Sequence, residues 1–468
     1  MSAPSNPSSG QAPSKPKTIK DGVRFVLLLS LFSSFPHLSL RGFTPAWFTI
    51  TIGTGILSNV FTNFPYGRET SGVRFVAALF LFFNLLLFAV FTLISLLRLA
   101  VYPKQVSRTL NSPVHAVYFS TVPMAATTLI NVTLNLVYNG YRYGGASFVY
   151  GIWVVWWINV AATLFCSYGL VHTMATVHES SFEQLTAVTT YPALPLCATA
   201  SSGPLIAVAL HPFNAEHALI SIAVSAVLQI MGLSLLFMLT TVYFYRMIVH
   251  GYPEGTGGTG VVSMFLALSG FAQPGVTMVF MGQAFRDIFP YQNSASDLLS
   301  NPMISPVMYI FCLVVAFSLW TVATMWLILI GLAVQDVARK GMLPLKLPFW
   351  SLIFPMGIYT ILTILLYRNF NSTFLRVYSA ITGVCTVILW ALAFFLTLRT
   401  IPNGGIFDTA HTASVNFGER KSRDSDTESL ASTSTRRVSI AVSLFGDLPL
   451  APDSPPAIET DKKGEEAV

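Results

Sequence analysis

Carboxylates are scarce in most of this sequence. Aspartate and glutamate make up 20 of the 468 residues, and many of these lie near the two ends, so few remain for the long apolar body. Charged residues of either sign amount to 10%, against 53% hydrophobic residues. This composition excludes an ordinary soluble globular protein and indicates a membrane protein with several spans.

Cysteine is also rare and is scattered along the chain. Cys166, Cys197, Cys312 and Cys385 lie far apart inside apolar segments, without close Cys/His spacing, so neither a zinc site nor a disulfide framework is predicted. The sequence lacks a nucleophile elbow, a phosphate loop, an HExxH motif and paired carboxylates. We therefore expect no catalytic residue, no metal, no cofactor and no nucleic-acid partner.

Ten long apolar runs follow one another with short connections. Each is long enough to cross the hydrocarbon core of a lipid bilayer as a helix. The runs cover about residues 43–63, 75–97, 113–137, 147–174, 186–210, 217–245, 259–285, 306–335, 347–366 and 375–398. The predicted fold class is an all-α integral membrane protein whose ten transmembrane helices form one domain, residues 41–400.

The two ends of the chain differ from this domain. Residues 1–40 are predicted to form a cytoplasmic tail with an apolar insertion at 25–40. Residues 401–468 are rich in Ser, Thr, Pro and charge, which predicts a disordered cytoplasmic tail. Two arginines precede Ser439 there, in the pattern that basophilic kinases recognise, so Ser439 is a candidate phosphorylation site and a kinase a candidate partner.

Lysine and arginine are distributed unevenly between the connections. If the N-terminus is cytoplasmic, thirteen of these residues before the C-terminal tail fall on the cytoplasmic side and six on the outside. Positively charged connections are typical of the cytoplasmic side. Both termini are therefore predicted to be cytoplasmic.

Proline alternates along the ten predicted helices. The odd-numbered helices contain interior or near-terminal prolines, among them Pro123, Pro195, Pro274 and Pro355, whereas the even-numbered ones are almost free of proline. A proline inside a helix removes a backbone hydrogen bond, and lipid offers no replacement. We predict five helical hairpins, with the odd helices forming a central pore and the even helices an outer ring.

Small polar residues recur on one face of the odd helices, at three- or four-residue spacing. They are Thr51, Thr54 and Ser58 on the first, Thr128, Asn131 and Asn135 on the third, Thr199 and Ser202 on the fifth, and Ser269, Gln273 and Thr277 on the seventh. Such residues also let membrane helices approach one another and form hydrogen bonds, so helix packing explains any single one. Together they favour a polar conduit.

The chemistry of this conduit predicts a small anion as its substrate. It contains hydroxyls and amides but no carboxylates, whereas a cation path is expected to carry Asp or Glu. Breaks in the helices, such as those expected at Pro355 and Gly357, expose backbone N–H groups with partial positive charge.

Phe354 stands directly before Pro355 in the ninth run. A bulky ring at this break would narrow the conduit and exclude water and ions. The sequence contains 36 phenylalanines, so simple packing explains the residue as well. Residue pattern alone leaves both interpretations open.

Five segments in order carry a family resemblance. They are Phe43-Thr-Pro-Ala-Trp-Phe-Thr-Ile-Thr-Ile-Gly-Thr-Gly55-Ile, Val122-Pro-Met-Ala-Ala-Thr-Thr-Leu-Ile-Asn131, Val155-Trp-Trp-Ile-Asn159, Leu185-Thr-Ala-Val-Thr-Thr-Tyr-Pro-Ala-Leu-Pro195 and Phe349-Trp-Ser-Leu-Ile-Phe-Pro-Met-Gly357. The chain resembles the tellurite-resistance and dicarboxylate transporter family, in particular its fungal sulfite efflux and malate transporter branch, which is related to plant slow anion channels. The resemblance implies five hairpins around a pore, commonly in homotrimers, and a pore occluded by Phe354.

The resemblance also implies transport of a small inorganic or dicarboxylate anion across the plasma membrane. Our first hypothesis is sulfite efflux, the second is C4-dicarboxylate (malate) transport, and the third is a passive gated anion channel. No Lys or Arg is evident in the middle of a predicted helix to bind two carboxylates, which favours the smaller anion, sulfite. The seventh run, Ser269-Gly-Phe-Ala-Gln273-Pro-Gly275, departs from the Gly-Pro-x-Gly-Gln-Gly-Gly typical of the sulfite branch and leaves the substrate open.

Overall fold

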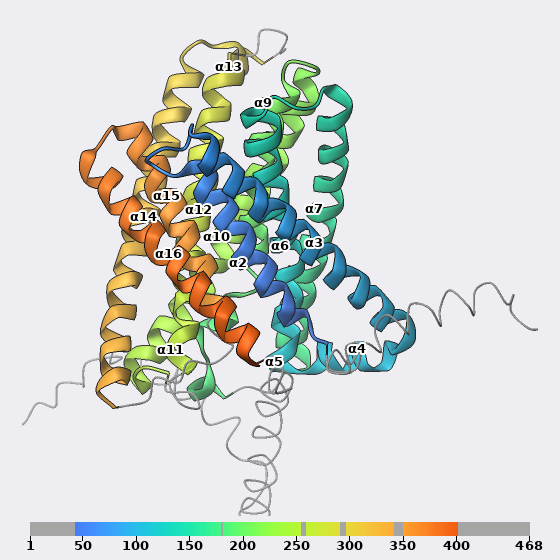
Figure 1. Ribbon diagram of the computed structural model, residues 1–468, viewed down its shortest axis with the longest axis vertical. Helices are drawn as coiled ribbons and strands as arrows, with labels where there is room; N and C mark the ends of the chain where they lie inside the picture. Colours follow the sequence, from blue (N-terminus) through green and yellow to red (C-terminus); the bar gives the residue numbers. More distant parts are fainter. Residues whose placement is uncertain (1–42, 179–180, 254–258, 291–295, 341–349, 401–468) are drawn as a thin grey trace, which may run out of the picture. The chain divides into compact units, whose positions relative to one another are not determined.

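The computed structural model describes residues 43–178, 181–253, 259–290, 296–340 and 350–400 (Figure 1). These residues form helices and connecting turns, without any β-strand. The helical segments are η1 (Pro45–Trp47), α2 (Phe48–Asn63), α3 (Ser71–Val101), α4 (Pro103–Asn111), α5 (Pro113–Ala116), η2 (Val117–Ser120), α6 (Thr121–Val132), η3 (Thr133–Gly140), α7 (Ala146–Thr176), η4 (Phe182–Gln184), η5 (Ala187–Thr190), α8 (Leu194–Ala200), α9 (Ser202–Leu210), α10 (Ala215–His250), α11 (Thr259–Ser263), α12 (Phe265–Ile288), α13 (Asp297–Ser300), α14 (Ile304–Arg339), α15 (Trp350–Phe370) and α16 (Thr373–Thr400). The predicted tails, the insertion at 25–40 and Ser439 lie outside the described residues.

Eight helical segments within the described residues are long and apolar enough to cross a membrane. They correspond to the predicted runs other than the first and the fifth. The first run contains α2, which has 16 residues, and the fifth contains the shorter apolar segment Leu194–Leu210. The prediction of an all-helical protein with several membrane spans is confirmed.

Burial alternates along the chain. In the most apolar window of each of α3, α7, α10, α14 and α16, 22% to 33% of the residues are buried. The corresponding value is 67% for the segment Val117–Gly140 and 89% for the α12 segment and α15. In Figure 1, α14 and α7 lie at opposite edges of the bundle, with α12, α2 and α6 between them. The spans with a proline beyond the first turn, Val117–Gly140, α12 and α15, are thus the more buried ones, whereas the exposed α14 carries Pro306 in its first turn.

Each buried segment contacts the more exposed helix that follows it in the chain. α2 packs against α3, α6 against α7, α8 and α9 against α10, α12 against α14, and α15 against α16. The buried segments also contact one another, since α2 packs on both α6 and α15, and α12 packs on α8, α9 and α15. The long exposed helices therefore cover a core made by the shorter or proline-containing segments.

The prolines occupy different positions within their helices. Pro274 and Pro355 lie inside α12 and α15, which nevertheless continue through them. Pro195 lies in the first turn of α8, where backbone N–H groups have no acceptor within the helix. A proline there costs no helical hydrogen bond, so Pro195 is compatible with the start of α8. Pro123 lies near the start of α6. The change of helix in the fifth run occurs at Ser201, between α8 and α9.

Candidate functional site

All five buried segments meet at one small cavity. Its wall is made by residues from α2, α6, α8, α12 and α15, and none comes from the more exposed helices. The lining residues are Ile56, Asn59, Met124, Thr127, Thr128, Asn131, Ala198, Gln273, Val276, Phe280, Phe354 and Ile358. We refer to this space as the central cavity.

The central cavity has an uncharged wall. Amides and hydroxyls supply its polar groups, from Asn59, Thr127, Thr128, Asn131 and Gln273, and the remaining wall is apolar. The volume available to water is about 10 Å³, which is close to the least space that holds a single water molecule. An anion with several heavy atoms therefore needs a side chain to move before it can occupy this position.

Phe354 is a large apolar group in the wall of the central cavity. It projects from α15 with 7% of its surface exposed, and Ile358 follows it one helical turn later on the same wall. Phe280 contributes a second ring from α12, also 7% exposed. Since a phenyl ring turns about two side-chain bonds, rotation of one of these rings is the simplest way to enlarge the space.

Asn131 is held in place by the corner between α8 and α9. Its Nδ2 donates to Ser201 Oγ at 2.9 Å, and its Oδ1 accepts a hydrogen bond from Ser202 Oγ at 2.7 Å. One Nδ2 hydrogen is committed to Ser201, and an amide nitrogen carries a second hydrogen that can bind another acceptor. Ser202 thus orients a lining amide and does not itself line the cavity.

A second polar cluster lies behind the cavity wall. Thr199 Oγ1 lies 2.7 Å from Thr163 Oγ1 and 3.3 Å from Thr127 Oγ1. Asn159 Nδ2 on α7 donates to both Thr127 Oγ1 and Thr199 Oγ1, at 3.0 and 3.2 Å, and also to the carbonyl of Pro123 at 3.2 Å. This cluster joins α6, α7 and α8 and fixes the position of Thr127.

Gln273 brings a further amide to the cavity from α12. The next residue is Pro274, whose carbonyl accepts a hydrogen bond from Gln229 Nε2 on α10 at 3.1 Å. Thr277 Oγ1 donates to the carbonyl of Cys197 at 3.2 Å and so ties α12 to α8. Ser269 Oγ donates to the carbonyl of Leu266 in its own helix. Of the predicted polar positions on α12, Gln273 lines the cavity.

The predicted polar face of the first helix turns toward other partners. Thr51 Oγ1 donates to the carbonyl of Phe48 at 2.7 Å, and Ser58 Oγ donates to the carbonyl of Ala77 on α3 at 2.7 Å. Thr54 Oγ1 accepts from Trp390 Nε1 on α16 at 3.3 Å. All three side chains are buried, but α2 lines the cavity with Ile56 and Asn59.

Two polar lining residues and one supporting residue were not among the predicted sites, nor were the apolar lining residues other than Phe354. Asn59 lies one position after Ser58 on α2, and Thr127 lies one position before Thr128, which also lines the cavity. Asn159 is the asparagine of the apolar fourth run, and a lone amide in such a run was the available signal.

Glycine permits close contact beside the cavity. A Cβ atom at Gly357 on α15 would lie 2.6 Å from Ile56 Cγ1, and one at Gly55 on α2 would lie 2.4 Å from Thr128 Oγ1. Any larger residue would force the helices apart. Gly357 therefore lets α15 approach α2 at the level of the central cavity.

Residues 42–398 match the family of voltage-dependent anion channels, SLAC1. The chain belongs to this family. Similar proteins include the sulfite efflux pump of Arthroderma benhamiae, 27% identical over 361 residues, or 77% of this chain and 91% of the relative. The sulfite efflux pump of Candida albicans is 26% identical over 68% of this chain and 65% of the relative. The malic acid transport protein of Schizosaccharomyces pombe is 24% identical over 80% of this chain and 83% of the relative.

The family membership confirms the resemblance found in the five sequence segments. This SLAC1-family chain is an anion transporter with several membrane spans. Members of such a family move ions and do not catalyse reactions, which agrees with the absence of catalytic motifs in the sequence. The relatives carry the names of two different anions, so the substrate of this chain is a separate question.

Proposed function

We propose that this chain exports sulfite or bisulfite across the plasma membrane through a pore at the position of the central cavity. The observation that carries the proposal is the composition of the cavity wall. Five segments far apart in the sequence converge there, and they present amides and hydroxyls without any charged side chain. Such donors stabilise a small anion while avoiding the large desolvation penalty of a buried cation.

In the proposed architecture, five helical hairpins surround the pore, with the buried segments as an inner ring and the exposed helices as an outer ring. Support comes from the alternation of burial and from the contact of each buried segment with the following helix. Since α12 and α15 continue through Pro274, Pro355 and Gly357, and Pro123 and Pro195 lie in the first turns of α6 and α8, the proposed pore relies on side-chain donors and not on helix breaks.

Phe354 is the proposed gate of this pore. The cavity is too small for sulfite as it stands, and Phe354 lies on the helix whose close approach to α2 depends on Gly357. When the ring turns aside, the anion would meet Thr128, Asn131 and Gln273. The other predicted polar residues, Thr51, Thr54, Ser58, Thr199, Ser202, Ser269 and Thr277, would support the wall from behind.

Malate is the second candidate, because a malic acid transport protein is among the relatives. Binding two carboxylates would call for strong donors or a cation, and the cavity wall contains no Lys or Arg. Sulfite, with one compact group of oxygens, fits the uncharged amides better.

The experiment that decides between sulfite and malate measures uptake into vesicles that contain the purified protein. Radiolabelled sulfite and malate are offered separately at equal concentration, with protein-free vesicles as the control. We expect sulfite uptake to exceed malate uptake by roughly tenfold, which corresponds to a preference of about 1.4 kcal/mol. Equal uptake, or faster malate uptake, would refute the assignment.

The third hypothesis, a passive gated channel, differs in its coupling. It predicts single-channel currents that persist without a proton gradient, so loss of transport on adding an uncoupler would argue against it. We further propose a homotrimer embedded in the lipid bilayer with both termini cytoplasmic, and regulation by a kinase at Ser439. Native mass spectrometry tests the homotrimer, and phosphopeptide mapping tests the phosphorylation of Ser439.

A further inference from the structure

A partly buried arginine joins the ends of two cavity-lining helices. Arg368 lies near the end of α15, and its Nη1 donates to Asn63 Oδ1 at 3.0 Å while its Nη2 donates to the carbonyl of Asn63 at 2.7 Å. Asn63 is the last residue of α2. The guanidinium therefore caps the C-terminal end of α2, where a positive charge is favourable.

Asn63 connects this arginine to the central cavity. Its Nδ2 donates to the carbonyl of Asn59 at 2.9 Å and lies 3.3 Å from Asn59 Oδ1. Asn59 stands one helical turn earlier on α2 and lines the cavity. A continuous hydrogen-bonded path thus runs from Arg368 through Asn63 to Asn59.

The charge of Arg368 has no counter-ion among the described residues. The acidic residue nearest in the chain to this end of α2, Glu69, pairs with Arg68 at 3.5 Å. Arg68 in turn acts on Arg368 as a like charge. A partly desolvated guanidinium without a carboxylate is costly unless an anion supplies the missing charge.

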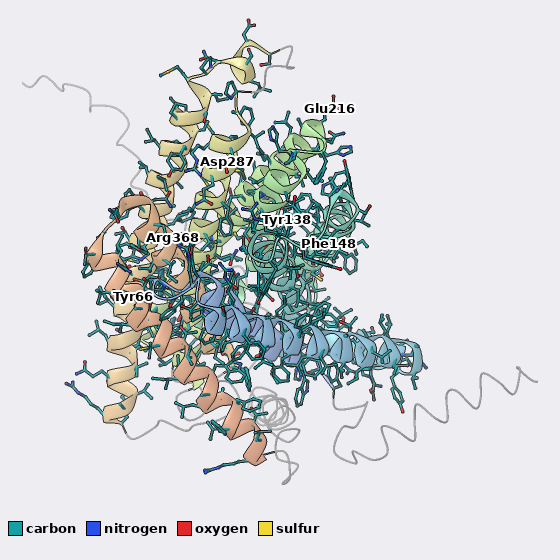
Figure 2. All side chains as sticks on the ribbon, turned by 45° about the horizontal axis from the view of Figure 1, so that its top comes forward. Tyr66, Tyr138, Phe148, Glu216, Asp287 and Arg368 are labelled. Carbon is teal, nitrogen blue, oxygen red and sulfur yellow. The ribbon has the colours of Figure 1, made fainter. Side chains whose placement is uncertain are left out.

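A third arginine, Arg376, contacts residues that are close in the chain to Asn63 and Arg368. The Arg376 guanidinium lies 4.3 Å from the ring centroid of Tyr66 and 5.7 Å from that of Tyr367. Its Nε is buried and makes no hydrogen bond to the part of the chain that the structure describes. Figure 2 labels Arg368 and Tyr66 beside α15 and α16.

Two other arginines among the described residues are satisfied in a different way, whereas Arg98 on α3 also has a buried Nε without a hydrogen-bond partner. Arg246 donates to the carbonyls of Glu183 and Gly251, and Arg286 pairs with Asp287 at 3.1 Å in an exposed position. Arg368 and Arg376 combine partial burial with an excess of positive charge. This is the chemistry that binds a small oxyanion through a planar fork of N–H donors.

We propose that Arg368 and Arg376 form an anion-binding site at the mouth of the pore, where an oxyanion is held next to the Asn63–Asn59 path. The site rests on the proposed function, because it shares the route through the central cavity. Placing the cations at the mouth concentrates anions there, while the cavity itself stays uncharged. In this arrangement the anion binds at the arginines first and then passes through the uncharged central cavity.

Binding is tested first, without transport. The unfolding midpoint of the purified protein is measured against increasing sodium sulfite, with sodium chloride at equal ionic strength as the reference. We expect sulfite to raise the midpoint of the parent protein more than chloride does, because a ligand of the folded state stabilises it. Arg368→Gln and Arg376→Gln should both need roughly tenfold more sulfite for the same shift.

Three variants separate this site from general effects of charge or folding. Arg286→Gln removes an exposed, paired arginine and should leave the sulfite response unchanged. Arg368→Lys keeps the charge but loses the fork, so it should fall between the parent and Arg368→Gln. Arg376→Gln leaves the Arg368–Asn63 contact intact and serves if Arg368→Gln does not fold.

Flux in vesicles then tests the link to transport. In Arg376→Gln the sulfite concentration for half-maximal flux should rise roughly tenfold, with a smaller change in maximal flux. A parent protein without a sulfite-specific shift, or equal responses in Arg286→Gln and Arg376→Gln, would overturn the site. If the parent binds sulfite but transports none, the proposed function fails while the binding site stands.

Discussion

Phe354 and Phe280 offer a matched pair at the scale of single residues. Both rings line the central cavity, both are 7% exposed, and they project from different helices. Only Phe354 belongs to the motif through which the family resemblance implies a gate. Truncating each ring in turn therefore distinguishes a gate from a general loss of packing.

We predict that Phe354→Ala raises sulfite leak from loaded vesicles by roughly tenfold, which corresponds to a barrier lower by about 1.4 kcal/mol. Phe280→Ala, as the control, should change the leak much less. Replacing a buried phenylalanine by alanine lowers the free energy of unfolding by about 3–5 kcal/mol. Folding of both variants is therefore checked by size-exclusion chromatography. Equal leak in two folded variants would assign Phe354 to packing.

The predicted polar residues lie in different surroundings, for a physical reason. Thr128, Asn131 and Gln273 line the cavity, whereas Thr54 and Ser58 bond to α16 and α3. Helical periodicity shows which residues share a face, but two faces of a buried helix both carry small polar residues. Sequence alone does not show which neighbour each face meets.

At the scale of helices, the pattern of proline was the informative signal. The spans with a proline beyond the first turn are buried, because their missing backbone hydrogen bonds are tolerated only away from lipid, whereas Pro306 in the first turn of the exposed α14 removes none. The position of each proline was harder to predict. Pro195 lies in the first turn of α8, and the change from α8 to α9 falls at Ser201, since helix boundaries depend on tertiary contacts as well as on local sequence.

Close packing of α15 on α2 gives a prediction for one glycine. In Gly357→Ala the added methyl group would lie 2.6 Å from Ile56, so it should destabilise the fold by about 1–3 kcal/mol. Thermal unfolding in detergent measures the change. Shortening the neighbour, as Gly357→Ala with Ile56→Ala, should restore part of the loss because the two sites interact.

Gly331 on α14 is the matched control. A Cβ atom there meets nothing within 4 Å, so Gly331→Ala should be neutral or stabilising by up to about 1 kcal/mol. A loss of stability in Gly331→Ala as large as that in Gly357→Ala would contradict the packing argument.

At the scale of the whole molecule, orientation in the membrane is open to a direct test. Lys104 follows α3, and Tyr143 lies between η3 and α7; both are exposed. With both termini cytoplasmic, Tyr143→Cys in intact cells should react with a membrane-impermeant maleimide and Lys104→Cys should not. The parent protein, with its four cysteines, gives the background. Labelling of Lys104→Cys alone would invert the proposed topology.

The uncharged wall of the central cavity has one more consequence, for the response to acidity. Amides, hydroxyls and hydrocarbon neither gain nor lose protons in the physiological range, so the lining keeps the same electrostatic character as pH changes. Any acid dependence of passage through the cavity would then report the protonation of the cargo. Flux can be compared, as a function of pH, between an anion that titrates near neutrality and one that does not. The difference would show which ionic form the protein carries.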